Sequence, residues 1–165
     1  MHSKWPKRLI LAAVVLSGLG VVALVGMDMV LSAPPIERTD LETLLPDTPT
    51  RVADIVGQTL DTVCVLAPHE KRVPDDARDA AAINDFLKTR TYGGDETHWA
   101  IVTKGAKGFA LARFERSAPL DIAWGDDAAE IAPDGFRPQP CAPGATAALI
   151  KFGGSQARII FGAIE

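Results

Sequence analysis

The sequence has few of the residues that build redox or hydrolytic sites. It contains two cysteines and three histidines, and residues 34–165 hold only two serines, Ser117 and Ser155. The absence of a CxxC pair argues against a redox-active dithiol, and neither serine lies in a GxSxG nucleophile motif. No two histidines are spaced as in HxxxH or HxH, which argues against a zinc site. We therefore expect no catalytic residue, no metal site and no cofactor.

An excess of positive charge is also lacking. The 165 residues include 17 Lys+Arg and 21 Asp+Glu, a net charge of -4. Residues 34–165 alone hold 14 basic and 20 acidic residues, a net charge of -6. A nucleic-acid-binding domain usually carries a basic face, so we expect no nucleic-acid partner. The hydrophobic share of 47% excludes a wholly disordered chain.

One long apolar run is present near the start of the chain. The segment from Leu9 to Met27 contains 19 residues and no charge, and about 20 helical residues cross a bilayer core. A cleaved signal peptide is the alternative, but its apolar core is shorter, about 7–15 residues. The exit through Leu31 to Pro35 is also a poor cleavage site. We predict an uncleaved transmembrane anchor over residues 9–31, which binds the lipid bilayer.

The flanking charges predict the orientation of this anchor. Basic residues are retained on the cytoplasmic side, and three of them precede the run: Lys4, Lys7 and Arg8. We therefore expect a single-pass protein in the cell membrane with a cytoplasmic tail over residues 1–8. A linker with a short helix over residues 32–48 and a domain over residues 49–165 would lie outside the cytoplasm, in the periplasm if the cell is Gram-negative.

Small residues share one face of the predicted anchor helix. Ala13, Ser17 and Gly20 follow one another at spacings of four and three, which lets two membrane helices approach closely. We expect a helix contact there, although such residues are common in any membrane span.

Residues 49–165 predict an α+β domain, with two or three helices packed on an antiparallel, hairpin-rich sheet. Apolar periodicity and capping residues predict helices over residues 49–59 and from Pro74 to Gly93, besides a brief one over residues 41–45. Period-two patterns predict strands, and residues 125–144 are expected to be a long loop. The expected strands cover residues 63–67, 98–103, 109–114, 120–124, 145–152 and 157–163.

Cys64 and Cys141 both lie in the part expected outside the cytoplasm, where thiols tend to be oxidised. We predict a disulfide between them that ties the 125–144 segment to the sheet. The alternatives are two free buried thiols or a pair of metal ligands.

Trp124 and Phe136 flank the acidic, proline-rich segment and could contact a protein partner, with half-buried packing as the alternative. Trp99 and Ile101 share a strand face and are expected in the core, which leaves His98 near the acidic residues Asp95 and Glu96. The leading hypothesis is an accessory or scaffold subunit of a cell-envelope membrane complex that binds a membrane protein. The alternative is a membrane-tethered enzyme or ligand-binding module that uses this acidic cluster.

Overall fold

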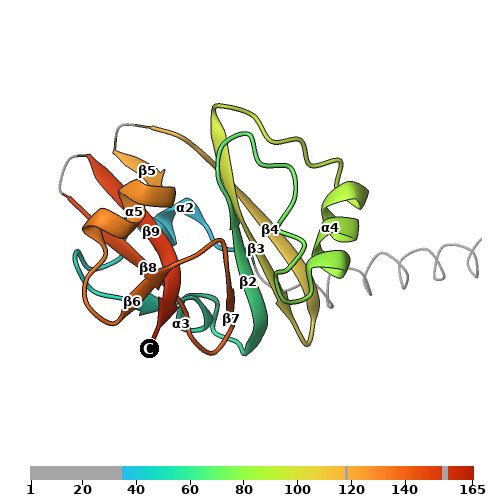
Figure 1. Ribbon diagram of the computed structural model, residues 1–165, viewed down its shortest axis with the longest axis horizontal. Helices are drawn as coiled ribbons and strands as arrows, with labels where there is room; N and C mark the ends of the chain where they lie inside the picture. The colour runs from blue at the N-terminus through green and yellow to red at the C-terminus, as the bar shows by residue number, and fades with distance from the viewer. Residues whose placement is uncertain (1–34, 118, 154–155) are drawn as a thin grey trace, which may run out of the picture. The chain divides into compact units, whose positions relative to one another are not determined.

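A computed structural model describes residues 35–117, 119–153 and 156–165 of the chain (Figure 1). The predicted anchor and its contact residues Ala13, Ser17 and Gly20 lie outside these ranges. Within them, no helix has both the length and the apolar character that crossing a membrane requires. The described residues form an α+β fold with few helices and mainly antiparallel sheets, which confirms the predicted class.

The first sheet is antiparallel throughout and has the order β4-β3-β2-β7. A hairpin at one edge of this sheet joins β3 to β4 through a two-residue turn, with Gly105 opposite Gly108. This hairpin confirms the prediction for residues 98–114. The four strands are β2 (Leu60–Leu66), β3 (His98–Gly105), β4 (Gly108–Glu115) and β7 (Cys141–Pro143).

The second sheet has the order β1-β8-β9-β5, and β6 also pairs with β9. The hairpin of β8 and β9 confirms the predicted last hairpin. The pairing of β5 with β9 is parallel, so this sheet is mixed rather than purely antiparallel. Its strands are β1 (Thr50–Arg51), β5 (Leu120–Ala123), β6 (Phe136–Pro138), β8 (Ala147–Phe152) and β9 (Ala157–Ile164).

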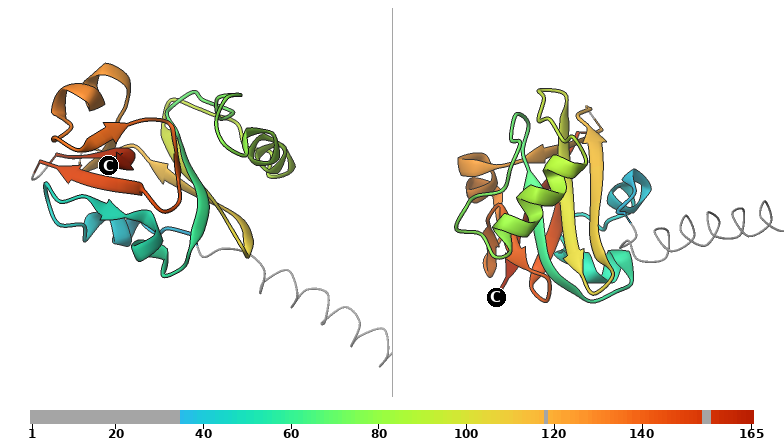
Figure 2. Two further views of the ribbon diagram at one scale, coloured as in Figure 1. Left: turned by 60° about the horizontal axis from the view of Figure 1, so that its bottom comes forward. Right: turned by 90° about the vertical axis from the view of Figure 1, so that its right-hand side faces the viewer.

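Two helices cover the outer faces of the sheets (Figure 2). Helix α4 (Ala80–Thr89) buries Ile83 and Leu87 against the first sheet. Helix α5 (Gly125–Ile131) buries Ala128 against the second. The domain therefore has four layers, helix, sheet, sheet and helix, while α2 (Arg38–Glu42) and α3 (Val52–Val56) are single-turn elements.

The main core lies between the two sheets. Trp99 and Ile101 point into it and are fully buried, as predicted, together with Leu149 and Ile159 of the second sheet. Ala100 and Val102 face the opposite side and are buried under α4. Because both faces of the first sheet are covered, β3 is apolar on both sides rather than alternating with polar residues.

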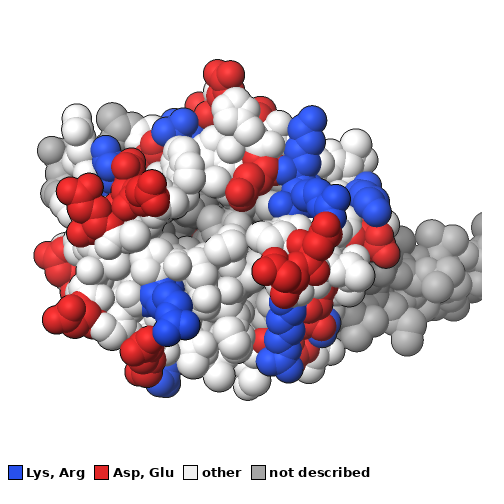
Figure 3. Space-filling view, viewed as in Figure 1, with Lys and Arg blue, Asp and Glu red and all other residues white. Residues whose placement is uncertain are grey.

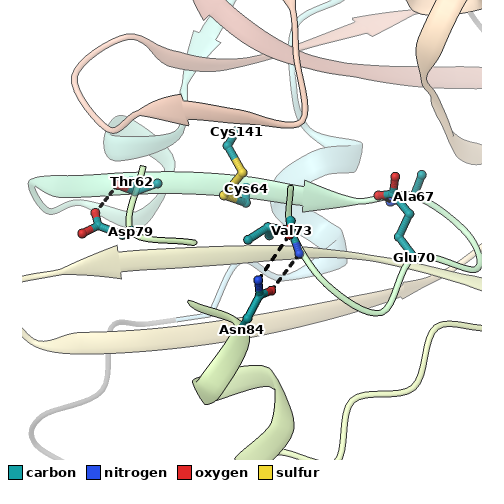
Figure 4. Close-up of a disulfide and its surroundings, with 8 residues drawn as sticks. All are labelled: Thr62, Cys64, Ala67, Glu70, Val73, Asp79, Asn84 and Cys141. Carbon is teal, nitrogen blue, oxygen red and sulfur yellow. Dashed lines mark hydrogen bonds between the residues drawn. A yellow bond between two sulfur atoms is a disulfide. The ribbon is translucent and has the colours of Figure 1, made fainter. Parts of the chain in front are cut away.

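Helix α4 begins later than predicted, at Ala80 rather than near Pro74. Asp79 before it adopts a left-handed conformation and binds two strands of the first sheet. Its carboxylate accepts a hydrogen bond from Thr62 Oγ1 at 2.7 Å (Figure 4). It accepts a second from Lys104 Nζ at 3.1 Å. These bonds, that of Thr62 first, lower the pKa of Asp79. The contacts of Asp79 with the first sheet thus determine where α4 begins, and the capping residues near Pro74 do not.

Residues 125–144 are not the predicted long loop, because they contain α5, β6 and β7. Both strands are short and pair with distant partners, β6 with β9 and β7 with β2. The predicted helix over residues 49–59 is likewise shorter, because β1 takes its first turn into the sheet.

The predicted disulfide is confirmed and joins β2 to β7. Cys64 and Cys141 lie directly opposite each other in the strand register, with 4.0 Å between their Cα atoms (Figure 4). Cys64 is fully buried beneath Val73 and α4. Asn84 of α4 bonds both the N–H and the carbonyl of Val73, at 2.9 and 3.3 Å, which holds this cover in place.

Candidate partner-binding pocket

A pocket of about 280 Å³ opens between the ends of the two sheets. Its walls come from Val65 and Ala67 at the end of β2, from Ile122 of β5 and from Phe161 of β9. These walls are apolar because both sheets turn their buried faces toward each other here. The hollow is visible near the centre of the space-filling view (Figure 3).

The segment 138–140 closes one side of this pocket and connects the two sheets. Gln139 N–H donates to the Phe161 carbonyl in the second sheet at 3.4 Å. The Pro140 carbonyl accepts from Val65 N–H in the first sheet at 2.8 Å. Prolines on both sides of Gln139 restrict the backbone, so this wall is stiff.

Trp124 stands at the rim of the pocket and is 44% exposed. The Arg116 guanidinium lies over its ring, 5.3 Å from the ring centroid. Asp121 holds Arg116 through bonds of 2.8 to 3.1 Å and raises its pKa. The Arg116 guanidinium thus positions the indole from one side, while a little under half of the residue stays exposed to solvent.

Acidic side chains lie beside this pocket on α5. Gly125 and Ala128 of that helix line the pocket, and Asp126, Asp127 and Glu130 of the same helix are exposed. Figure 3 shows acidic groups near the hollow. Glu70 also lines the pocket, and its carboxylate accepts the N–H of Ala67 at 2.8 Å. The pocket therefore combines an apolar interior with acidic side chains on α5, of which Asp127 lies 3.9 Å from Arg158, and with Arg116 over Trp124 at the rim.

Phe136, the other predicted contact residue, is 7% exposed. It pairs with Ile164 across β6 and β9 and packs in the cluster under α5. Of the two predicted contact residues, only Trp124 presents its side chain at the surface. The wall residues Pro138, Pro140 and Glu70 were not expected, and the Pro-x-Pro sequence before Cys141 was a local signal for the two prolines alone.

Asp95 and His98, which the alternative hypothesis uses, do meet. His98 Nδ1 lies 3.0 Å from Asp95 Oδ1, and Thr97 Oγ1 donates to the same oxygen at 2.8 Å. Arg113 Nη2 donates to the other carboxylate oxygen at 3.0 Å. The hydrogen bond with His98, followed by those from Thr97, holds the pKa of Asp95 well below its ordinary value. Asp95 is thus an anion whose bonds tie β3 and β4 to the loop before them.

Glu96 contributes its backbone carbonyl to Arg116 at 3.4 Å. His69 lies nearby, with its N–H bonded to the Asp95 carbonyl at 3.0 Å. In the described ranges, no group of three or more His, Cys, Asp or Glu side chains gathers in an arrangement that could hold a metal ion. The two cysteines are joined to each other.

Asp95→Asn should lower the melting temperature at pH 7. A carboxylate with a lowered native pKa stabilises the fold above its unfolded pKa of about 3.9, and this contribution is lost as the pH falls through the native value. The difference in melting temperature from wild type should therefore narrow from about pH 5 downward. Asp85→Asn, which removes an exposed pair with Lys88 at 3.1 Å, is the control and should change little. A difference that stays constant from pH 7 to pH 2.5 would contradict this role.

The comparisons with known proteins do not place this chain in a family. No family model, no curated protein and no solved structure matches it.

Proposed function

We propose that this chain is a single-pass membrane-anchored protein whose extracytoplasmic domain acts as an accessory or scaffold subunit of a cell-envelope membrane complex. The observation that carries the proposal is the apolar pocket with Trp124 exposed at its rim. The apolar run over residues 9–31 supports the anchor, and the disulfide is in keeping with a domain outside the cytoplasm.

The chemistry of the pocket selects the partner segment. The pocket accepts a single apolar or aromatic side chain of the partner, because one such side chain fills most of a volume of about 280 Å³. The exposed Asp126, Asp127 and Glu130 beside it favour a segment with flanking Lys or Arg. The partner is therefore a membrane protein with an apolar residue set between basic ones in an extracytoplasmic segment.

Trp124→Ala should release this partner. Aromatic anchors at interface centres dominate binding, so we expect at least about a tenfold loss in recovered partner. The measurement is affinity purification of the full chain from membranes in mild detergent, followed by quantitative mass spectrometry. Because acidic side chains of α5 lie beside the pocket, recovery should also fall as salt rises.

Leu45→Ala is the matched control, since Leu45 is another large apolar side chain, 68% exposed, and does not line the pocket. It should leave recovery unchanged. Equal recovery by Trp124→Ala and wild type would overturn the role of the pocket. Recovery of the chain only from the soluble fraction would contradict the anchor.

A further inference from the structure

Strand β4 is the one long edge among the described strands. It ends the first sheet and pairs over eight residues with β3, without a register shift. The other strands at sheet ends are much shorter, with two residues in β1, four in β5 and three in β7. Long regular edges can pair with another strand, and proteins usually interrupt them with proline or a bulge. Neither interrupts β4 (Figure 2).

The backbone of β4 presents alternate residues outward. Arg116 N–H bonds to Thr97 in line with β3, at 2.8 Å, whereas the Glu115 carbonyl points away and accepts from Arg38 at 3.3 Å. By the alternation of an antiparallel ladder, the N–H and carbonyl groups of Phe109, Leu111 and Arg113 also point away from β3. The outward N–H and carbonyl groups of Phe109, Leu111 and Arg113 have no hydrogen-bond partner among the described residues.

Opposite charges lie near the two ends of β4, so they would attract each other in an antiparallel pair of two copies. Lys107 is the second residue of the turn before β4, and Glu115 is the last residue of β4. In an antiparallel pair of two β4 strands centred on Leu111, Lys107 of each copy would lie next to Glu115 of the other. Both side chains are exposed and form no ion pair within the described ranges. A parallel pair would instead set each charge against its own copy. A shift of two residues toward the turn would place Lys107 opposite Arg113.

The side chains on the two faces also fit this register. Phe109, which stacks on Phe86 at 5.0 Å between ring centroids, would lie opposite Arg113 of the second copy. The guanidinium of Arg113 is already bonded to Asp95 and lies 5.8 Å from the centroid of the Tyr92 ring, so this pairing adds a second aromatic neighbour to an arginine that is held in place. The half-buried Leu111 would meet its own copy and become covered. On the opposite face Ala110 meets Ala112, and neither is large enough to block the approach.

We propose that two copies of this chain associate through antiparallel pairing of their β4 strands, which joins the two four-stranded sheets into one. The pair has two-fold symmetry about Leu111. Outward groups of Phe109, Leu111 and Arg113 supply the inter-copy hydrogen bonds, and Lys107 with Glu115 sets the register. None of the residues proposed for this pairing lines the Trp124 pocket.

Charge-reversal variants, tested singly and mixed with each other, examine this pairing. Each full chain is purified in mild detergent, and light scattering after size exclusion measures whether it is a monomer or a dimer. Lys107→Glu alone and Glu115→Lys alone each create two like-charge contacts, and we expect about a tenfold or greater rise in the dimer dissociation constant. A mixture of the two variants restores both contacts and should dimerise like wild type. So should the double variant, which carries both changes.

A cross-link locates the two-fold axis. Leu111→Cys brings two thiols together at the centre of the pair, and the two natural cysteines are already joined to each other. It should form a covalent dimer on a non-reducing gel, whereas Leu45→Cys, at an exposed position elsewhere, should not. A wild-type chain that is monomeric at micromolar concentration would overturn the proposal. So would a dimer that both single charge reversals leave intact, or a Leu111→Cys chain that cross-links no better than Leu45→Cys.

Discussion

Removing the disulfide should destabilise the domain by about 2–5 kcal/mol. Cys64→Ala combined with Cys141→Ala opens a bridge that spans 77 residues, and the chain-entropy model gives about 4 kcal/mol for such a loop. The strand that the bridge holds has only three paired residues, so little else keeps it on the sheet. Urea unfolding of a fragment over residues 34–165, which contains every described element, measures the loss.

Reduction provides the control for this experiment. A thiol reductant should destabilise the wild-type fragment by a similar amount and leave the double alanine variant unchanged. Because β7 follows directly on the 138–140 wall, we also expect loss of the bridge to weaken partner recovery through the Trp124 pocket. If the variant unfolded at the same urea concentration as wild type, the bridge would not stabilise the domain.

The elements that the sequence predicted correctly are those with local partners. The hairpin of β3 and β4 closes over two residues, and buried side chains of β4 alternate with less buried ones along the chain. The hairpin of β8 and β9 is similarly local. Neither needs information from distant parts of the sequence, because the pairing residues follow one another across a glycine-bearing turn.

The elements that were missed depend on distant partners. Strands β6 and β7 have three residues each, too few to show a period of two, and they pair with β9 and β2. Helix α5 has the composition of a loop, with one glycine and two aspartates at its start, and covers the second sheet through Ala128. The disulfide was predictable despite this, because only two cysteines exist and both lie beyond the apolar run.

The candidate site was predictable only in part. An aromatic residue beside an acidic, proline-rich segment indicated exposure, which holds for the side chain of Trp124. For Phe136 the same argument was misleading, because pairing of β6 with β9 places it in the core. The pocket itself has walls from β2, β5, β9 and residues 138–140. Only the packing of two sheets brings these together, so the one local signal, the Pro-x-Pro sequence before Cys141, does not reveal the pocket.

Trp99→Ala should destabilise the domain by about 3–5 kcal/mol, the usual cost of truncating a fully buried large aromatic side chain. Trp99 is 0% exposed, and its ring lies 4.5 Å from that of Phe114, directly opposite on β4. Both rings lie between the two sheets, so their contacts extend to the second sheet. Neighbouring strands on both sides hold β3 in place, and the resulting cavity cannot collapse fully. Urea unfolding of the 34–165 fragment measures this change.

Two variants separate the packing of Trp99 from the mere loss of a tryptophan. Trp99→Phe keeps an aromatic ring against Phe114 and leaves a smaller cavity, so it should cost less than half as much as alanine, about 1–2 kcal/mol. Trp124→Ala removes an equally large ring from the pocket rim, where the residue is already 44% exposed, and should cost less still. The order of the two Trp99 variants follows from the size of the cavity, and the lower cost at Trp124 follows from its exposure. If the Trp99→Ala variant unfolded no more easily than the Trp124→Ala variant, Trp99 would not lie in a core between the two sheets. The pocket geometry, which depends on the packing of these sheets, would then be wrong as well.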